Sequence, residues 1–264
     1  MKIFLSSLEN APCPVGMYEI PNLSSHIIKK GIKMKWNLIS YYYIRGSKQK
    51  IAEQIRDYSE LVVVDSGAHS FQFGKKVDFD QYTREYAEWI KDYDRPNVLG
   101  YFEMDCDNVL GYEKVLELRK ILQTASDKII PVWHKERGID DFYKMCDEYS
   151  GKVISITGFS NADIRDDQYL AFVKYAKDHD CKVFCLGMTR KKVLDKVPFD
   201  FCDSSSWHQC SIYGRPLNPP KGKKFAKPKD FAERVNQEFY SYKQGMELQE
   251  HYYKKWRKAC QQEL

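Results

Sequence analysis

The stretch Leu61-Val62-Val63-Val64-Asp65-Ser66-Gly67-Ala68 contains four consecutive apolar residues, followed by a carboxylate, a hydroxyl and a glycine. A continuous apolar run of this kind is typical of a strand buried on both faces, as in a parallel sheet covered by helices. Because the run ends on polar residues, the strand is expected to deliver Asp65 and Ser66 to one edge of the sheet.

The same pattern recurs along the chain. The expected strands cover 2–6, 36–43, 61–68, 97–105, 129–134, 153–158, 182–188 and 199–203, and the expected helices cover 47–55, 78–93, 111–125, 140–149, 166–178 and 190–196. Alternation of strands and helices predicts parallel pairing. Eight such units in 264 residues favour an α/β fold of the (β/α)8 TIM-barrel type over an open doubly wound sheet, which stays the alternative. No glycine-rich dinucleotide or P-loop motif follows any expected strand.

The chain changes character after Trp207. Residues 213–229 are rich in Pro, Gly and Lys and are expected to form a loop, and residues 230–258 are expected to form a long amphipathic helix that Gly245 bends or breaks. We therefore expect a catalytic barrel over residues 1–212 and a basic loop and C-terminal helix over residues 213–264, packed on the barrel.

Positive charge is concentrated near the C-terminus. Residues 221–264 contain 11 Lys or Arg and 6 Asp or Glu, which accounts for the whole formal net charge of +5. A localised basic segment suits a polyanion such as nucleic acid, with Lys254, Lys255, Arg257 and Lys258 as the expected contacts. A solvated Lys-rich helix is the simpler alternative.

Cysteine usage and hydropathy bear on the compartment. The eight Cys include no CxxC pair, the apolar run after Met1 is too short for a signal peptide, and no stretch of 18 apolar residues occurs. These features predict a cytoplasmic protein with reduced thiols and no membrane segment.

Polar or glycine residues end most of the expected strands, and a barrel brings these strand ends to one rim. The residues in question are Asp65, Ser66, Gly67, Glu103, Asp105, His134, Gly158, Gly187, Met188 and Asp203. Two carboxylates from different strands suit glycosyl transfer, in which one attacks an anomeric carbon and the other shuttles a proton to the leaving base. Glycines allow a flat ring to approach the backbone, and Phe71, Phe159 and Trp207 could stack on it.

Several of these motifs resemble the tRNA-guanine transglycosylase superfamily. Asp65-Ser66-Gly67-Ala68, followed by Phe71-Gln72, is similar to its Asp-Ser-Gly-Gly-Phe-Gln signature. Phe102-Glu103-Met104-Asp105 is similar to its strand that ends in a purine-binding Asp. Leu186-Gly187-Met188-Thr189, then a helix and Phe199-Asp200-Phe201-Cys202-Asp203, is similar to the segment that carries its nucleophile. The resemblance covers roughly residues 60–207 and is closest to the phage-associated branch that inserts 7-deazaguanines into DNA.

The resemblance implies a role for each matching residue. Asp203 would attack C1′ of a target deoxyguanosine, and Asp65 would act as general acid and then as general base. Asp105 would bind the Watson–Crick edge of the purine, and His134 falls where the tRNA enzymes use Gln. The resemblance also implies that the base pocket is shaped by Ser66, Gly67, Gly158, Gly187 and Met188.

The implied substrates are DNA and a free 7-deazaguanine such as preQ0. The tRNA enzymes carry a Cys-x-Cys-x2-Cys and His zinc site after the nucleophile, whereas this chain has only the scattered Cys202, Cys210 and Cys260, with His208 and His251. No metal or other cofactor is therefore expected, and DNA is favoured over tRNA, which stays the alternative. A base in a duplex would be flipped out, with the basic segment holding its phosphates.

Two other classes of function stay open. A metal-dependent TIM-barrel hydrolase could use Asp65, Glu103, Asp105, His134 and Asp203, although the chain lacks a His-x-His pair on an early strand. A nucleic-acid-binding module without catalysis would need only the basic segment. The sequence leaves open the base inserted, the sequence context, any accessory protein or homodimer, and host cytoplasm as the location if the chain is phage-encoded.

Overall fold

A computed structural model describes residues 1–264 except 15, 72–76, 159–162, 215–216, 218–225 and 260–264. Gln72, Phe159 and Cys260, which entered the sequence argument, lie outside the described residues. The side chain of Cys210 is also outside them.

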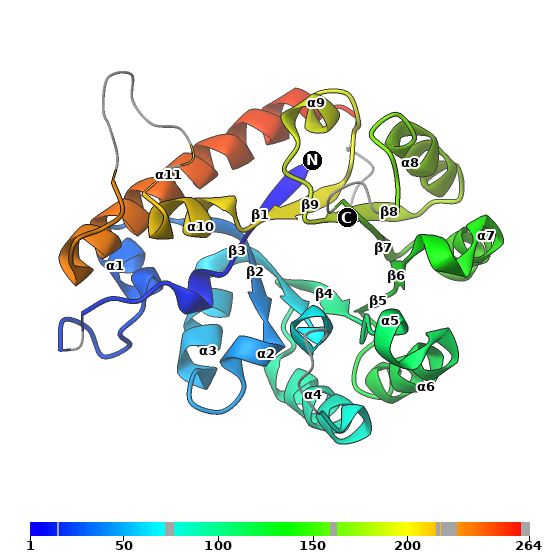
Figure 1. The fold of residues 1–264 in the computed structure, drawn as a ribbon, viewed down its shortest axis with the longest axis horizontal. Helices are drawn as coiled ribbons and strands as arrows, with labels where there is room; N and C mark the ends of the chain where they lie inside the picture. Colours follow the sequence, from blue (N-terminus) through cyan, green and yellow to red (C-terminus); the bar gives the residue numbers. More distant parts are fainter. Residues whose placement is uncertain (15, 72–76, 159–162, 215–216, 218–225, 260–264) are drawn as a thin grey trace.

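All strands of the sheet are parallel, in the order β5-β4-β3-β2-β1-β9-β8-β7-β6, and Figure 1 shows helices on the outside of this nearly closed ring. The strands are β1 (Lys2–Ser6), β2 (Met34–Ser40), β3 (Ser59–Asp65), β4 (Val98–Phe102), β5 (Ile129–Ile130), β6 (Val132–Trp133), β7 (Val153–Thr157), β8 (Lys182–Leu186) and β9 (Phe201–Ser204). The expected barrel-like α/β architecture is confirmed. The described sheet has nine strands because Pro131, which has no N–H for a ladder, separates β5 on β4 from β6 on β7.

Helices follow nearly every strand. The α-helices are α1 (Leu23–Lys29), α2 (Tyr41–Ile44), α3 (Gln49–Tyr58), α4 (Phe79–Tyr93), α5 (Asp107–Leu110), α6 (Tyr112–Gln123), α7 (Ile139–Glu148), α8 (Tyr169–Asp178), α9 (Lys191–Leu194), α10 (Ser206–Ile212) and α11 (Phe231–Trp256). The 3-10 helices are η1 (Leu8–Asn10), η2 (Ala68–Phe71) and η3 (Lys135–Arg137). The described part of the chain contains no helix with the length and apolar character needed to cross a bilayer.

The local structure differs from the expectations at three points. Residues 41–43 form the start of α2 and not the end of a strand, because β2 stops at Ser40 where the chain leaves the sheet. The short helices α1 and α10 were not anticipated. Gly245 does not break α11: a Cβ there would lie 2.9 Å from the Leu5 side chain, so this glycine lets the helix pack closely on β1.

The inside of the barrel is filled by large apolar side chains. Phe4, Leu38, Val63, Phe184 and Phe201 form one buried cluster that draws on strands from around the ring. The Phe4 and Phe184 rings have centroids 5.5 Å apart. This aromatic layer closes the barrel from within, so any ligand must approach from an end of the strands.

The C-terminal helix lies along the outside of the barrel (Figure 1). Gln249 donates from its amide to the carbonyls of Ile3 and Trp36, at 2.8 and 2.7 Å, and the Tyr242 hydroxyl donates to Asn37 at 3.0 Å. The expectation of a basic helix needs correction: α11 itself contains four acidic and four basic residues. The positive excess comes from the residues that flank it.

Candidate active site

Strand alternation places a polar layer directly above the aromatic layer. Side chains two residues apart on a strand point to the same face. Phe4, Leu38, Val63 and Phe201 point inward, so the residues two positions later also face the barrel axis, at the carboxyl ends of the strands. These residues are Ser6, Ser40, Asp65 and Asp203. The sequence predicted the two carboxylates of this layer and missed the two serines.

Asp203 is buried at the end of β9 and both of its carboxylate oxygens accept hydrogen bonds. Ser6 donates its hydroxyl to Oδ2 at 2.8 Å, and Gly187 donates its backbone N–H to Oδ1 at 2.6 Å. Burial raises the pKa of Asp203, and these two hydrogen bonds oppose that shift because they favour the ionised form. The carboxylate is thus held in one orientation by groups from β1 and from the loop after β8.

Asp65 occupies the matching position on β3 and has a different environment. Its Oδ2 accepts the Gly67 N–H at 3.1 Å. Burial raises the pKa of Asp65 to about 6, with further increases from the charges of Asp105 and Asp203, while the Ser40 hydroxyl and the Gly67 N–H oppose the shift. A carboxyl with this pKa can give and take a proton near neutral pH.

Glu9 is a third buried carboxyl beside this layer, which sequence reasoning missed. It lies in η1, only 2% exposed, and its Oε1 accepts the Ser40 N–H at 3.2 Å. Its Oε2 has no hydrogen-bond partner among the described residues. Burial raises the pKa of Glu9 to about 7, and the charge of Asp65 contributes to that shift. Glu9 lies in a short 3-10 helix outside the strands, so the strand pattern carried no signal for it.

Substitution of Glu9 by Gln should change the pH dependence of stability. The folded pKa of about 7 exceeds the ordinary 4.5, so the folded state holds a proton that the unfolded state has lost, and wild-type stability falls as pH rises through this window. The advantage of Glu9→Gln over wild type should therefore grow by about 3 kcal/mol between pH 4 and pH 8. Urea unfolding at several pH values measures it. The exposed Glu113→Gln is the control, and parallel curves for wild type and Glu9→Gln would contradict the assignment.

A chain of hydrogen bonds crosses the rim next to these carboxylates. His134 contacts Asp105 through Nε2, and Asp163 through Nδ1 at 3.0 Å, while Thr157 donates its hydroxyl to Asp163. Burial alone would lower the pKa of His134, but the two carboxylates outweigh it and raise the pKa to about 10. His134 is therefore an imidazolium at neutral pH, and it fixes the Asp105 carboxylate. Asp163 and Thr157 were not anticipated from the sequence.

The Glu103 side chain has a structural role. Its fully buried carboxylate accepts from the Arg119 Nε and, at 2.7 Å, from the Val132 N–H, and Arg137 lies 3.6 Å away. The Glu103 side chain is thus tied to α6 and β6 by charged and backbone donors. Protein donors thus already engage both Glu103 oxygens, which argues against the alternative that Glu103 serves as a metal ligand.

Among the described residues, one group of side chains could approach a metal ion: Asp105, Asp107 and His134 have ligand atoms within 4.8 Å of one another. Arg137 donates to both carboxylate oxygens of Asp107, at 2.6 and 2.7 Å. Because His134 also binds Asp105, protein donors already neutralise both acids of the group.

The expected pocket residues have unequal access to the rim. Ser66 donates its hydroxyl to the Glu103 carbonyl at 2.8 Å. Gly67 has φ +79° and a Cβ there would lie 2.3 Å from the Tyr42 Cβ, so only glycine fits the turn. Gly158 donates its N–H to the Leu186 carbonyl at 2.6 Å and accepts from Arg190, which engages both backbone groups. Met188 is buried in the apolar cluster outside the sheet and does not belong to the inward layer.

The aromatic residues expected to stack on a flat base are structural. Trp207 is fully buried, packs edge-on against Tyr242 and donates its indole N–H to the Ser6 carbonyl at 2.8 Å. Phe71 is 3% exposed and packs among Tyr42, Phe79 and Tyr82. Trp207 therefore fixes the β1 end that carries Ser6, the residue bonded to Asp203.

The basic residues of the C-terminus are not brought to the carboxylates. Helix α11 begins near the carboxyl end of β9, where Glu238 faces His208, and runs toward the amino-terminal halves of β1 and β2. Lys255 pairs with Asp195 at 2.7 Å and Lys254 with Glu250 at 3.1 Å. Lys254, Lys255, Arg257 and Lys258 are exposed at the far end of this helix.

Comparison of the chain with protein-family models, with characterised proteins and with solved structures finds no match.

Proposed function

We propose that the protein is a transglycosylase that replaces guanine in DNA with a 7-deazaguanine through a covalent glycosyl-enzyme. The observation that supports it best is the pair of inward-facing carboxyls Asp65 and Asp203, one titrating near neutral pH and the other held by Ser6 and Gly187. Two carboxyls in different environments fit a division into acid–base catalyst and nucleophile. In this proposal the sheet counts as an eight-stranded barrel, in which β5 and β6 are one strand interrupted at Pro131.

The chemistry needs no redox partner. An Asp203 oxygen forms a bond to C1′ while the bond from C1′ to guanine N9 breaks, and protonated Asp65 supplies the proton that the departing base takes up. Asp65, now ionised, accepts the N9 proton of the incoming 7-deazaguanine. That nitrogen attacks C1′ and releases Asp203, so the enzyme is regenerated.

The remaining rim groups fit recognition of a flat base. The His134 imidazolium holds Asp105 so that its second oxygen can accept from the edge of a purine. Gly67 brings the backbone close to the layer of carboxylates where a side chain would collide with Tyr42. The aromatic layer beneath blocks the barrel, so the target nucleotide would have to be flipped into the rim.

The direct test is nucleoside mass spectrometry of DNA incubated with the protein and candidate 7-deazaguanine bases. The proposal expects a 7-deazaguanine nucleoside in DNA, one free guanine released per base inserted, and activity that persists in EDTA. Incorporation into tRNA and not into DNA would move the proposal to the tRNA alternative. Loss of activity in EDTA, with metal in the purified protein, would favour the hydrolase candidate, and Asp105, Asp107 and His134 would then be the first ligands to test.

Phosphate binding should depend on cations at the rim. Lys135 in η3 and Lys192 in α9 are exposed just after the ends of β6 and β8. Because each lost phosphate contact lowers the slope of log K against log salt by about 0.9, the double variant Lys135→Ala/Lys192→Ala should flatten that slope by about 2. Fluorescence anisotropy with labelled duplex DNA measures this slope. Arg257→Ala/Lys258→Ala is the matched pair, and a larger change in that pair would support the contacts predicted from the sequence instead.

A further inference from the structure

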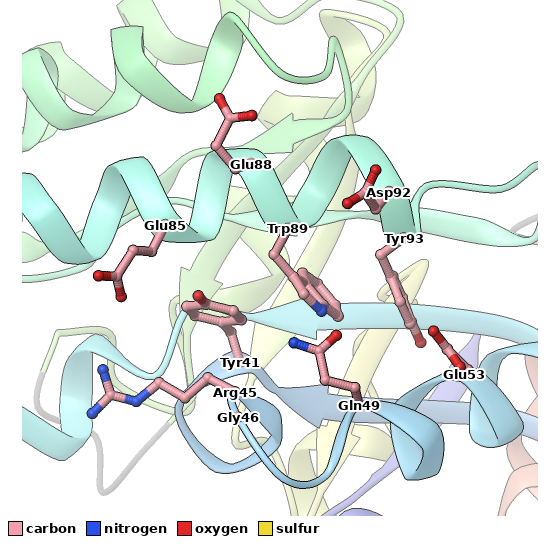
Figure 2. Close-up of a pocket in the computed structure, with 10 residues that line it drawn as sticks. All are labelled: Tyr41, Arg45, Gly46, Gln49, Glu53, Glu85, Glu88, Trp89, Asp92 and Tyr93. Atoms are coloured by element: carbon pink, nitrogen blue, oxygen red, sulfur yellow. The ribbon is translucent and has the colours of Figure 1, made fainter.

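A cavity of about 610 Å³ lies outside the strand wall, between α2, α3 and α4 (Figure 2). This volume is in the range of small-ligand sites. Tyr41, Trp89 and Tyr93 form an aromatic wall, with ring centroids 5.4 Å apart for Tyr41 and Trp89 and 4.2 Å apart for Trp89 and Tyr93. Tyr93 stacks nearly parallel on Trp89, so each of these two rings covers one face of the other.

Carboxylates surround this aromatic wall. Glu85, Glu88 and Asp92 follow each other along α4 at spacings of three and four residues, which places them on one helix face over roughly 10 Å. Glu53 lines the cavity from α3, on the opposite side in Figure 2. Arg45 is the single positive side chain of the ten that line the cavity, and its guanidinium lies 5.0 Å from the centroid of the Tyr82 ring.

A polar atom that faces the cavity has no protein partner. Tyr41 is 4% exposed and lines the cavity, and no residue in the described part of the chain forms a hydrogen bond with its hydroxyl. In Figure 2 this hydroxyl points toward α4, into the space between Glu85 and Trp89. This hydroxyl is open to the cavity, so a ligand that hydrogen-bonds to it would take the place of water there.

The charge and shape of this cavity favour one class of ligand over others. These carboxylates are spread along the cavity and are not among the described groups whose ligand atoms converge within 4.8 Å, which argues against a single metal ion. Anions would meet four negative side chains. Methylene groups between separated ammonium groups would cover the aromatic wall, while the ammonium groups would reach carboxylates and ring faces.

We propose that this cavity is a binding site for a linear aliphatic polyamine. The ammonium groups contact Glu53, Glu85 and Asp92, one of them donates to the Tyr41 hydroxyl, and the methylene chain lies on Trp89. Glu88 contributes less, because it is already paired with Lys91 at 2.6 Å. The site is separate from the Asp65 and Asp203 rim and does not depend on the function proposed for it.

Isothermal titration calorimetry of the full chain with spermidine at constant ionic strength tests the site. The proposal expects one spermidine per chain and affinity at least about tenfold weaker in Glu85→Gln/Asp92→Asn, two substitutions on the exposed side of α4. Trp89→Phe should also weaken binding, since phenylalanine attracts cations less than tryptophan does.

Glu113→Gln/Glu117→Gln, which removes two exposed acids from α6, is the matched control and should change the affinity less than about twofold. Three results would overturn the proposal: no binding heat, equal weakening in the control pair, or full displacement of spermidine by an equal charge of Mg²⁺. The last two would identify diffuse counterion association.

Discussion

Asp203→Asn should reduce exchange of labelled 7-deazaguanine into DNA by on the order of 10⁴-fold or more, while DNA affinity changes little. Asn can accept the Ser6 and Gly187 hydrogen bonds at one oxygen only, and it cannot attack C1′ as a carboxylate does. Single-turnover incorporation measures the loss. Denaturing gels of protein trapped on DNA should show a covalent adduct for wild type alone.

The residue just before the same strand offers a control. Asp200 immediately precedes β9, is buried to nearly the same extent as Asp203, and accepts the Val183 N–H at 2.9 Å. Asp200→Asn should disturb the amino-terminal end of the barrel while it leaves exchange within about tenfold of wild type. If Asp203→Asn kept wild-type incorporation, or if both variants lost it equally, Asp203 would not be the nucleophile.

Asp65→Asn should lower the exchange rate by about 10²–10⁴-fold and remove a step from its pH profile. Wild-type Asp65, with a pKa of about 6, must be protonated when guanine leaves and ionised when the new base attacks. The wild-type rate should therefore be greatest near pH 6 and fall on both sides. The residual rate of the Asn variant should lack this dependence.

Stopped-time incorporation assays from pH 5 to pH 9 measure the profile. Asp94→Asn is the control, because Asp94 bonds to Tyr101 and Lys128 at the other end of the barrel. A wild-type profile retained in Asp65→Asn would assign the proton transfers to another group, and Glu9, with its pKa of about 7, would be the first to test.

The strand positions could be read from the sequence because each apolar run must be buried on both faces. Val62-Val63-Val64 predicted β3 and its polar end. Tyr41 was wrongly predicted to lie in a strand because aromatic residues favour strands. In the structure, three Tyr residues follow the last pairing position of β2. Pro131 marked a break in a strand that the pattern alone treated as continuous.

Partners far apart in the sequence could not be predicted. Ser6 and Asp203 are 197 residues apart, and periodicity gives the direction of each side chain but not the group that it meets. Glu103 and Asp105 looked equivalent as strand-end acids, and only the positions of Arg119 and His134 separate a structural carboxylate from one at the rim. The cationic end of α11 shows the same limit. Its charge could be predicted from the sequence, but its position on the barrel could not.

The seam between β1 and β9 has a consequence for how the chain acquires its fold. Strand β1 is paired on one side with residues 201–204 and covered by Gln249, whose bond to Ile3 spans 246 residues. The contact order of this seam is high because its paired segments are far apart in the sequence. Pairing β1 with β9 therefore has a large entropic cost of loop closure, and we expect it late in folding. During synthesis β1 must wait with one edge unpaired until residues 201–249 have emerged. We expect this interval to be the stage at which nascent chains are most prone to aggregate and most dependent on chaperones.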